Sequence, residues 1–298
     1  MSRLSELLLD LTWSQWVALG VSGSGVRIPQ RCIDLETAIV FIPALQDLDP
    51  RLHGEALDWC VAFAGEFTSV ASLKQRLSLF GSDHRKGFAT VAAEVNRHGR
   101  TKWPTDASAT RSRSHFKPTG KSRLTLSRPA SVQLRGRKIF GISARADVLT
   151  GLALDAADKD RGPLWTNVNR LVPFLGYTRR NLSEALRDLA IGNALGQMTF
   201  GKVVRYGLIH PQPLRELLSP LPSEPLQPWA QRLALALSLL EIERTSQNLS
   251  RVSSAVALRK ALDVHRDRFL ELRDPLPELS SDEGLERVVD WIEPRLQP

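Results

Sequence analysis

Four polar side chains on one predicted helix carry the clearest chemistry in this sequence. They are Arg179, Arg180, Ser183 and Arg187. A guanidinium donates hydrogen bonds in a fixed planar fork, which matches phosphate oxygens and the acceptor edge of guanine. The same spacing is also compatible with an ordinary amphipathic helix whose basic face is solvated, so the surrounding elements have to decide between the two interpretations.

The helix that carries these side chains is predicted from a cap and an apolar period. Thr178 stands at its start, where a hydroxyl can accept hydrogen bonds from the free N–H groups of the first turn. The apolar positions recur at i, i+3, i+4 and i+7, and they are Leu182, Ala185, Leu186 and Leu189. In a groove-binding helix the residues near the N-terminus reach the base edges, which assigns base contacts to Arg179, Arg180 and Ser183. Arg187, further along the helix, is assigned to a phosphate.

Two helices and a hairpin are predicted around this helix. Segment 142–160 has a helical apolar period, and a shorter stripe over 168–175 ends at Gly176, a residue suited to positive φ. Pro173 lacks a backbone N–H and is expected to kink this second helix. Segment 197–209 alternates and is rich in β-branched and aromatic residues, which predicts a hairpin with its turn at Gly201–Lys202.

The order of three helices and a hairpin resembles the winged helix-turn-helix transcriptional regulators, broadly of the MarR and ArsR kind. The stretches ARADVL and NVNRLVPFLGYTRRNLSEALRDLA carry the resemblance, which covers roughly 142–210. It implies that the basic helix enters a groove of double-stranded DNA and that the hairpin is a wing. Lys202 and Arg205 would then contact the DNA backbone or a minor groove.

The overall layout is also similar to that of bacterial proteins encoded beside nucleotidyltransferase toxins of the AbiE type. This resemblance implies an antitoxin that represses its own operon while a helical region holds the toxin. Regulators with a winged module often dimerise through helices outside it, and a two-fold protein suits a palindromic site. A homodimer, or a complex with a cognate toxin, is therefore expected.

The chain is expected to be mainly α-helical, with four parts. They are a helical N-terminal domain (1–99), a basic linker (100–130), the winged helix-turn-helix domain (131–210) and a helical C-terminal region (211–298) for dimerisation or partner binding. Pro43 is expected to interrupt or end a helix. Segment 56–79 is a weaker candidate for a second helix-turn-helix.

The charge distribution favours an anionic partner. The formal net charge is +8, and segment 97–145 holds thirteen Lys+Arg and one acid, whereas segment 211–298 holds eleven Lys+Arg and fourteen acids. The stretch 100–128 is interpreted as a flexible tether or as a basic arm that settles on DNA phosphates, with the arm favoured. Arg135, Arg137 and Lys138 form a further cluster that faces DNA or flanks a lead-in helix.

The residue types that enzymes need are sparse. Cys32 and Cys60 form no disulfide framework or metal motif, and the six histidines show no metal-binding spacing. The glycine-rich stretch 20–26 lacks the G-K-[ST] ending of a phosphate loop, and no G-x-S-x-G elbow is present. No catalytic residue, cofactor or metal is therefore predicted, although a nuclease or enzyme subunit that uses the winged module to position a substrate remains an alternative. The absence of a signal peptide or long apolar run predicts a cytoplasmic protein without membrane contact.

Overall fold

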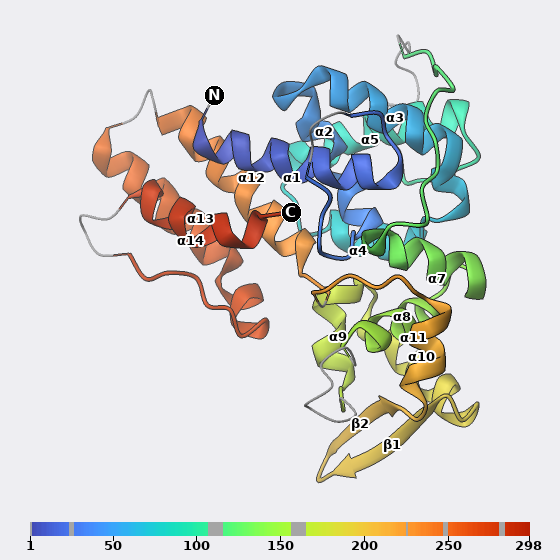
Figure 1. Cartoon of the computed structure of the whole chain (residues 1–298). Helices are drawn as coiled ribbons and strands as arrows, with labels where there is room; N and C mark the ends of the chain where they lie inside the picture. The colour runs from blue at the N-terminus through green and yellow to red at the C-terminus, as the bar shows by residue number, and fades with distance from the viewer. Residues whose placement is uncertain are drawn as a thin grey trace.

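The structure is a computed structural model that describes residues 2–23, 27–106, 116–155, 165–224, 226–246, 250–279 and 284–298. These residues form a mainly helical chain with a single two-stranded antiparallel sheet (Figure 1). The fold class predicted from the sequence is confirmed at this level. None of the described helices is both long and apolar enough to cross a lipid bilayer.

Helices from both ends of the chain form one body, which we call the helical body. Its members are α1 (Arg3–Leu19), α2 (Leu35–Leu48), α3 (Pro50–Phe63), the short 3-10 helix η1 (Ala64–Glu66), α4 (Val70–Leu77), α5 (Ser82–His98), α12 (Trp229–Ser246), α13 (Arg251–Glu271) and α14 (Leu285–Leu296). α1 packs against both α12 and α14, and a single hydrophobic core runs from Leu4 to Leu296 (Figure 1). The N-terminal and C-terminal regions, expected as separate parts, therefore share one core.

Helix α2 continues through Pro43, which corrects the expectation that this proline ends or interrupts it. The helix runs to Leu48, with Asp34 as its N-cap and Asp49 as its C-cap. A proline inside a helix removes one hydrogen bond and crowds the carbonyl one turn earlier. In the preceding turn the carbonyl of Val40 also contacts Nε2 of His84 of α5 at 2.7 Å.

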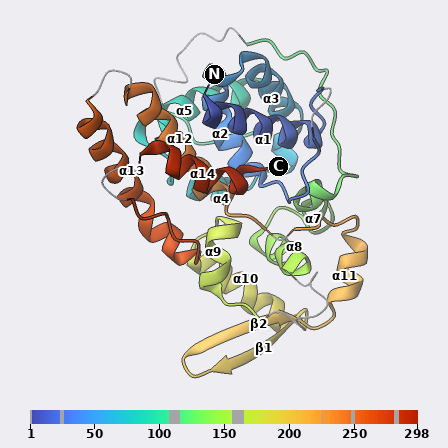
Figure 2. The ribbon, with the colours of Figure 1, turned by 60° about the vertical axis from the view of Figure 1, so that its left-hand side comes forward.

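A second group of elements, which we call the central unit, carries the predicted basic helix. It comprises α8 (Ala144–Asp155), α9 (Val168–Leu175), α10 (Arg179–Ile191), β1 (Leu195–Phe200) and β2 (Val203–Leu208). These elements enclose a small core of their own, formed by Leu152, Leu171, Leu175, Leu182 and Leu186 among others. The hairpin projects away from the helical body (Figures 1 and 2).

Short elements connect the central unit to the helical body. Before it come the 3-10 helix η2 (Pro129–Ser131) and α7 (Val132–Phe140), and after it comes α11 (Pro211–Leu217), a helix within the stretch expected to be a proline-rich bridge. The predicted helix over 142–160 is present as α8 up to Asp155, and 156–160 lie outside the described residues.

The described parts of the predicted basic linker are packed against the helical body, which corrects their assignment as a flexible tether, whereas the DNA-binding arm stays a prediction. Trp103 is buried and stacks on Phe88. The carboxylate of Asp58 accepts hydrogen bonds from the backbone N–H groups of Thr119, Gly120 and Ser122. These bonds fix the backbone over 119–122, while 107–115 lie outside the described residues.

A buried network of charges joins the central unit to the helical body. The guanidinium of Arg137 in α7 is fully buried and pairs with Asp147 in α8 at 2.6 Å and with Glu36 in α2 at 2.6 Å. It also donates to the carbonyl oxygen of Phe67 at 2.6 Å. Burial alone would raise the pKa of Glu36, but the nearby guanidinium groups of Arg137 and Arg76 outweigh that effect and lower it.

We predict that Arg137→Met destabilises the protein strongly. The variant leaves two buried carboxylates without their main counter-charge, a loss that costs about 3–5 kcal/mol of unfolding free energy. The measurement is equilibrium urea unfolding followed by circular dichroism. The neighbouring Lys138→Met is the control, because Lys138 forms an exposed ion pair with Glu66 and its loss should barely change the midpoint. Equal stability of Arg137→Met and Lys138→Met would contradict the role given to the network.

Candidate nucleic-acid interface

The turn between α9 and α10 has the features predicted from the sequence. Gly176 adopts φ 63 and ψ 33, the left-handed conformation that glycine takes without steric cost, and it ends α9. Thr178 caps α10, because its Oγ1 accepts a hydrogen bond from the backbone N–H of Asn181 at 3.2 Å. Pro173 lies inside α9, two residues before its last residue, and its carbonyl accepts a hydrogen bond from the side-chain amide of Gln231 of α12.

An arginine from the helical body holds this turn. The guanidinium of Arg76 in α4 donates to the carbonyl oxygens of Leu175, at 2.9 Å, and of Phe174, at 3.2 Å. Its Nε pairs with Asp34, the N-cap of α2, at 2.7 Å. The C-terminal carbonyls of a helix lack intrahelical partners and carry partial negative charge, so a buried cation satisfies both needs.

The inward direction of Arg76 also corrects the interpretation of 56–79 as a second helix-turn-helix. Its side chain is 2% exposed and is therefore not available to a ligand outside the protein. Next to it, Ser72 donates to the carbonyl of Leu175. Segment 70–77 therefore serves as a support for α9.

Helix α10 presents its cations outward. Leu182, Ala185 and Leu186 are buried, as the apolar period predicted, and the side chains of Arg179, Arg180 and Arg187 are exposed. Arg180 forms an ion pair with Glu184 at 2.9 Å, and its side chain is 88% exposed. The hydroxyl of Ser183 donates to the carbonyl of Arg179 at 2.8 Å, so only its acceptor lone pairs face outward for a ligand.

The hairpin pairs in the register that places its turn at Gly201–Lys202, as predicted. Met198 lies opposite Arg205 and Phe200 opposite Val203. Lys202 and Arg205 are exposed, and the guanidinium of Arg205 lies over the ring of Phe200, 4.9 Å from its centroid. The sequence indicated the cations of the hairpin but not this aromatic partner, although strand alternation across the predicted turn places Phe200 and Arg205 on one face.

The cluster of Arg135, Arg137 and Lys138 does not form a DNA-facing surface, which corrects that assignment for both arginines. Arg137 is fully buried in the charge network. The guanidinium of Arg135 donates to the backbone carbonyl oxygens of Leu218, Arg128, Leu126 and Pro220, which occupy its donors. Lys138 remains exposed, but its ammonium is bound to Glu66 at 2.8 Å.

Two further cations of the central unit were not singled out in the sequence. Arg170 is exposed in the first turn of α9, and Arg145 of α8 pairs with Asp188 of α10 at 3.2 Å. Their positions follow from how α8, α9 and α10 pack, which no local pattern specifies. Segment 165–210 as a whole carries six Lys+Arg against two acids.

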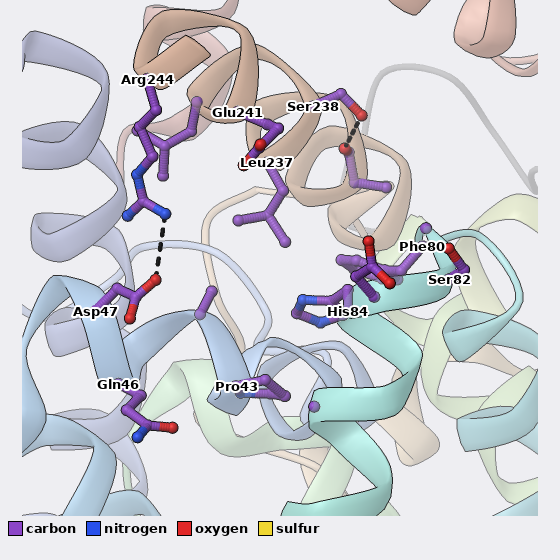
Figure 3. A pocket seen from close by; sticks show the side chains of 16 residues that line it. Pro43, Gln46, Asp47, Phe80, Ser82, His84, Leu237, Ser238, Glu241 and Arg244 are labelled. Atoms are coloured by element: carbon purple, nitrogen blue, oxygen red, sulfur yellow. Dashed lines mark hydrogen bonds and ion pairs between the residues drawn. The ribbon is translucent and has the colours of Figure 1, made fainter.

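A cleft of about 670 Å³ lies in the helical body, lined by α2, α5 and α12 (Figure 3). The ion pair between Arg244 and Asp47, at 3.2 Å, stands at one side. The imidazole of His84 stacks on Phe80 with their centroids 4.8 Å apart, and burial lowers the pKa of His84. The side chains that line the cleft include carboxylates, hydroxyls and apolar groups, and no one type predominates.

One serine of this cleft contacts a histidine. The hydroxyl of Ser238 lies 3.1 Å from Nε2 of His265, and it lies at the same distance from the carbonyl of Ala234, to which it donates. Burial lowers the pKa of His265 to about 4, and its Nδ1 has no hydrogen-bond partner in the described chain. A nucleophile–base pair normally has a third group that orients the base, and none contacts this nitrogen. The described residues also include no group of three His, Cys, Asp or Glu side chains placed to hold a metal ion.

Comparisons of the chain with protein-family models, with curated proteins and with solved structures gave no significant match.

We predict that Gly176→Ala costs more stability than Gly201→Ala. Both glycines have φ near +60°, and the backbone strain of an alanine there is about 1–2 kcal/mol. A Cβ at Gly176 would lie 1.3 Å from Nη1 of Arg76 and must displace this guanidinium, whereas nothing lies within 4 Å at Gly201. The excess loss at Gly176 is therefore expected to reach about 2–3 kcal/mol. Urea unfolding measures both, and equal losses would show that Arg76 does not hold the turn.

Proposed function

We propose that this protein binds double-stranded DNA with sequence specificity through a winged helix-turn-helix formed by the central unit, and that it regulates transcription, most simply as a bacterial repressor. The observation that carries the proposal is the outer face of α10. Three arginines lie there on a helix whose first turn is capped and whose opposite face is buried. The surrounding excess of cations in 165–210 supports the same partner.

The dimensions of DNA suit this arrangement. The major groove admits an α-helix, and each base pair presents a distinct pattern of donors and acceptors in it. Arg179 and Arg180 lie at the N-terminal end of α10, which carries the positive end of the helix dipole. In this proposal they read bases, together with the acceptor lone pairs of Ser183. Arg187 and the wing residue Lys202 neutralise phosphates.

The buried contacts of the turn give the proposed interface its rigidity. A recognition helix must hold its register to within a base pair, and the carbonyls at the end of α9 are fixed by Arg76 of the helical body. Tyr177, directly before the cap of α10, donates its hydroxyl to the buried Asp147 at 2.8 Å. The angle at which α10 leaves the body is therefore set by polar bonds as well as by packing.

The alternative is an antitoxin of a nucleotidyltransferase-type toxin–antitoxin or phage-defence system that represses its own operon. One surface of the chain supports binding to another protein, as this alternative requires. Helix α13 exposes Val252, Val256, Val264 and Leu270, each by more than half of its surface. Val252 and Val256 lie one turn apart, and adjacent exposed apolar side chains of this kind are typical of an interaction site. A second copy of the chain, as in a homodimer, and a cognate toxin both satisfy this observation.

We predict that Arg180→Ala weakens binding to a specific duplex much more than binding to random DNA. The duplex is selected from a random pool by the protein itself, and affinities are measured by fluorescence anisotropy. Loss of a bidentate base contact costs about 1–3 kcal/mol at the specific site and relaxes the preference for that base pair. Arg266→Ala is the matched control, because Arg266 is also exposed and paired with an acid on its own helix, α13. An equal loss on specific and random DNA would show that Arg180 contacts only phosphate.

We predict that Lys202→Ala weakens binding to all sequences alike and lowers the salt dependence. Each phosphate contact that is lost reduces the slope of log K against log salt by about one. The measurement is a titration of the selected and random duplexes at four salt concentrations. A slope identical to that of the unsubstituted protein would place the wing away from DNA.

A further inference from the structure

The tip of the hairpin exposes a group of apolar side chains on one face. Opposite residues of an antiparallel pair share a face, so the register places Met198, Phe200, Val203 and Arg205 together. The exposed fractions are 50% for Phe200, 45% for Val203 and 38% for Met198. Single exposed apolar residues are common on protein surfaces, but three adjacent ones on a projecting element mark a contact surface.

The root of the hairpin is anchored, so the exposed tip is presented in a fixed direction. Leu195 is buried at the start of β1, and Tyr206 and Leu208 pack against the core of the central unit. Tyr206 also exchanges two backbone hydrogen bonds with Thr166, at 2.9 and 2.8 Å. An isolated two-stranded hairpin is marginal in water, and these contacts supply the support that it needs.

The charges around this face indicate what covers it. Segment 195–210 contains two cations, Lys202 and Arg205, and no acid. The guanidinium of Arg205 lies over the Phe200 ring, which joins the apolar surface to a positive charge. A purely apolar protein partner would have no charge to pair with these cations. A stack of bases between two phosphate chains offers apolar faces and negative charge together.

We propose that Phe200, flanked by Met198 and Val203, inserts from the minor groove between two base pairs and bends the duplex. This inference rests on the proposed function and adds how the wing acts. Proteins that wedge apolar side chains into the minor groove unstack one base step and kink the duplex by about 20–90°. Pyrimidine–purine steps unstack most easily, so the wing selects such a step without hydrogen bonds to its bases. On insertion the bases replace the guanidinium of Arg205 over the Phe200 ring, and Arg205 moves with Lys202 to the flanking phosphates.

The test uses the full chain and duplexes that it selects from a random pool. One probe is a duplex with 2-aminopurine placed at each step in turn, whose fluorescence rises when the base unstacks. A second is a duplex with dyes at both ends, whose energy transfer reports bending. For the unsubstituted protein we expect a fluorescence rise confined to one step per bound wing, together with a bend.

Three variants assign the signal to its side chain. Phe200→Ala should abolish the fluorescence rise and most of the bend and lower the affinity about tenfold, the size of one base–aromatic contact. Phe200→Trp should retain the rise and the bend. Thr199→Ala is the control, because Thr199 is exposed on the opposite face of the same strand.

The outcomes separate this inference from the function on which it rests. Tight selective binding without unstacking or bending overturns the wedge and leaves the proposed function intact. Failure to select any duplex overturns the proposed function itself. Sedimentation compares the mass of the DNA-free Phe200→Asp variant with that of the unsubstituted protein. A lower mass of the variant would show that this face binds a second copy of the chain. That result would also overturn the wedge.

Discussion

The buried guanidinium groups of Arg137 and Arg76 are the constraint on which the rest of the structure depends. Arg137 joins α2, α7 and α8, and Arg76 joins the start of α2 to the end of α9. Burying an ionised group is costly unless its charge and its hydrogen bonds are satisfied, and here three carboxylates and several carbonyls do so. Such a network tolerates little displacement, because each donor has its acceptor within a narrow range of distance. It therefore fixes the central unit at one orientation on the helical body.

The network also changes how the basic character of the chain should be interpreted. The net charge of +8 does not say where the positive surface lies, because Arg76 and Arg137 are interior and pair with Asp34, Glu36 and Asp147. Arg135 is directed at carbonyls of the connecting segments. The cations that remain exposed in the central unit lie on α8, α9, α10 and the hairpin. The proposed interface is thus narrower than the charge count implies, and it coincides with the elements that the network holds.

Local patterns were enough to predict the elements of the central unit. The period of Leu182, Ala185 and Leu186, the cap at Thr178 and the glycine at 176 all act within a few residues, so one sequence reveals them. The positions of Arg135 and Arg137 could not be predicted in this way. Arg137 meets Glu36 across 101 positions of the chain, and a charged residue that is buried by a distant partner looks identical in sequence to a solvated one. The same reason explains why the shared core of the two ends of the chain was missed.

The most direct test of the account is to map where α10 lies on DNA. Cys32 and Cys60 are buried, and burial raises the pKa of the Cys32 thiol to about 12, so a new exposed cysteine can be labelled selectively. An iron chelate attached at Ile191→Cys, at the C-terminal end of α10 and 75% exposed, generates hydroxyl radicals that cleave only nearby nucleotides. Attachment at Val252→Cys on α13, which is 74% exposed, serves as the control. If α10 lies in the groove, we expect cleavage of a short, fixed stretch of each strand of the selected duplex from position 191 and none from position 252. Uniform cleavage, or equal cleavage from both positions, would contradict it.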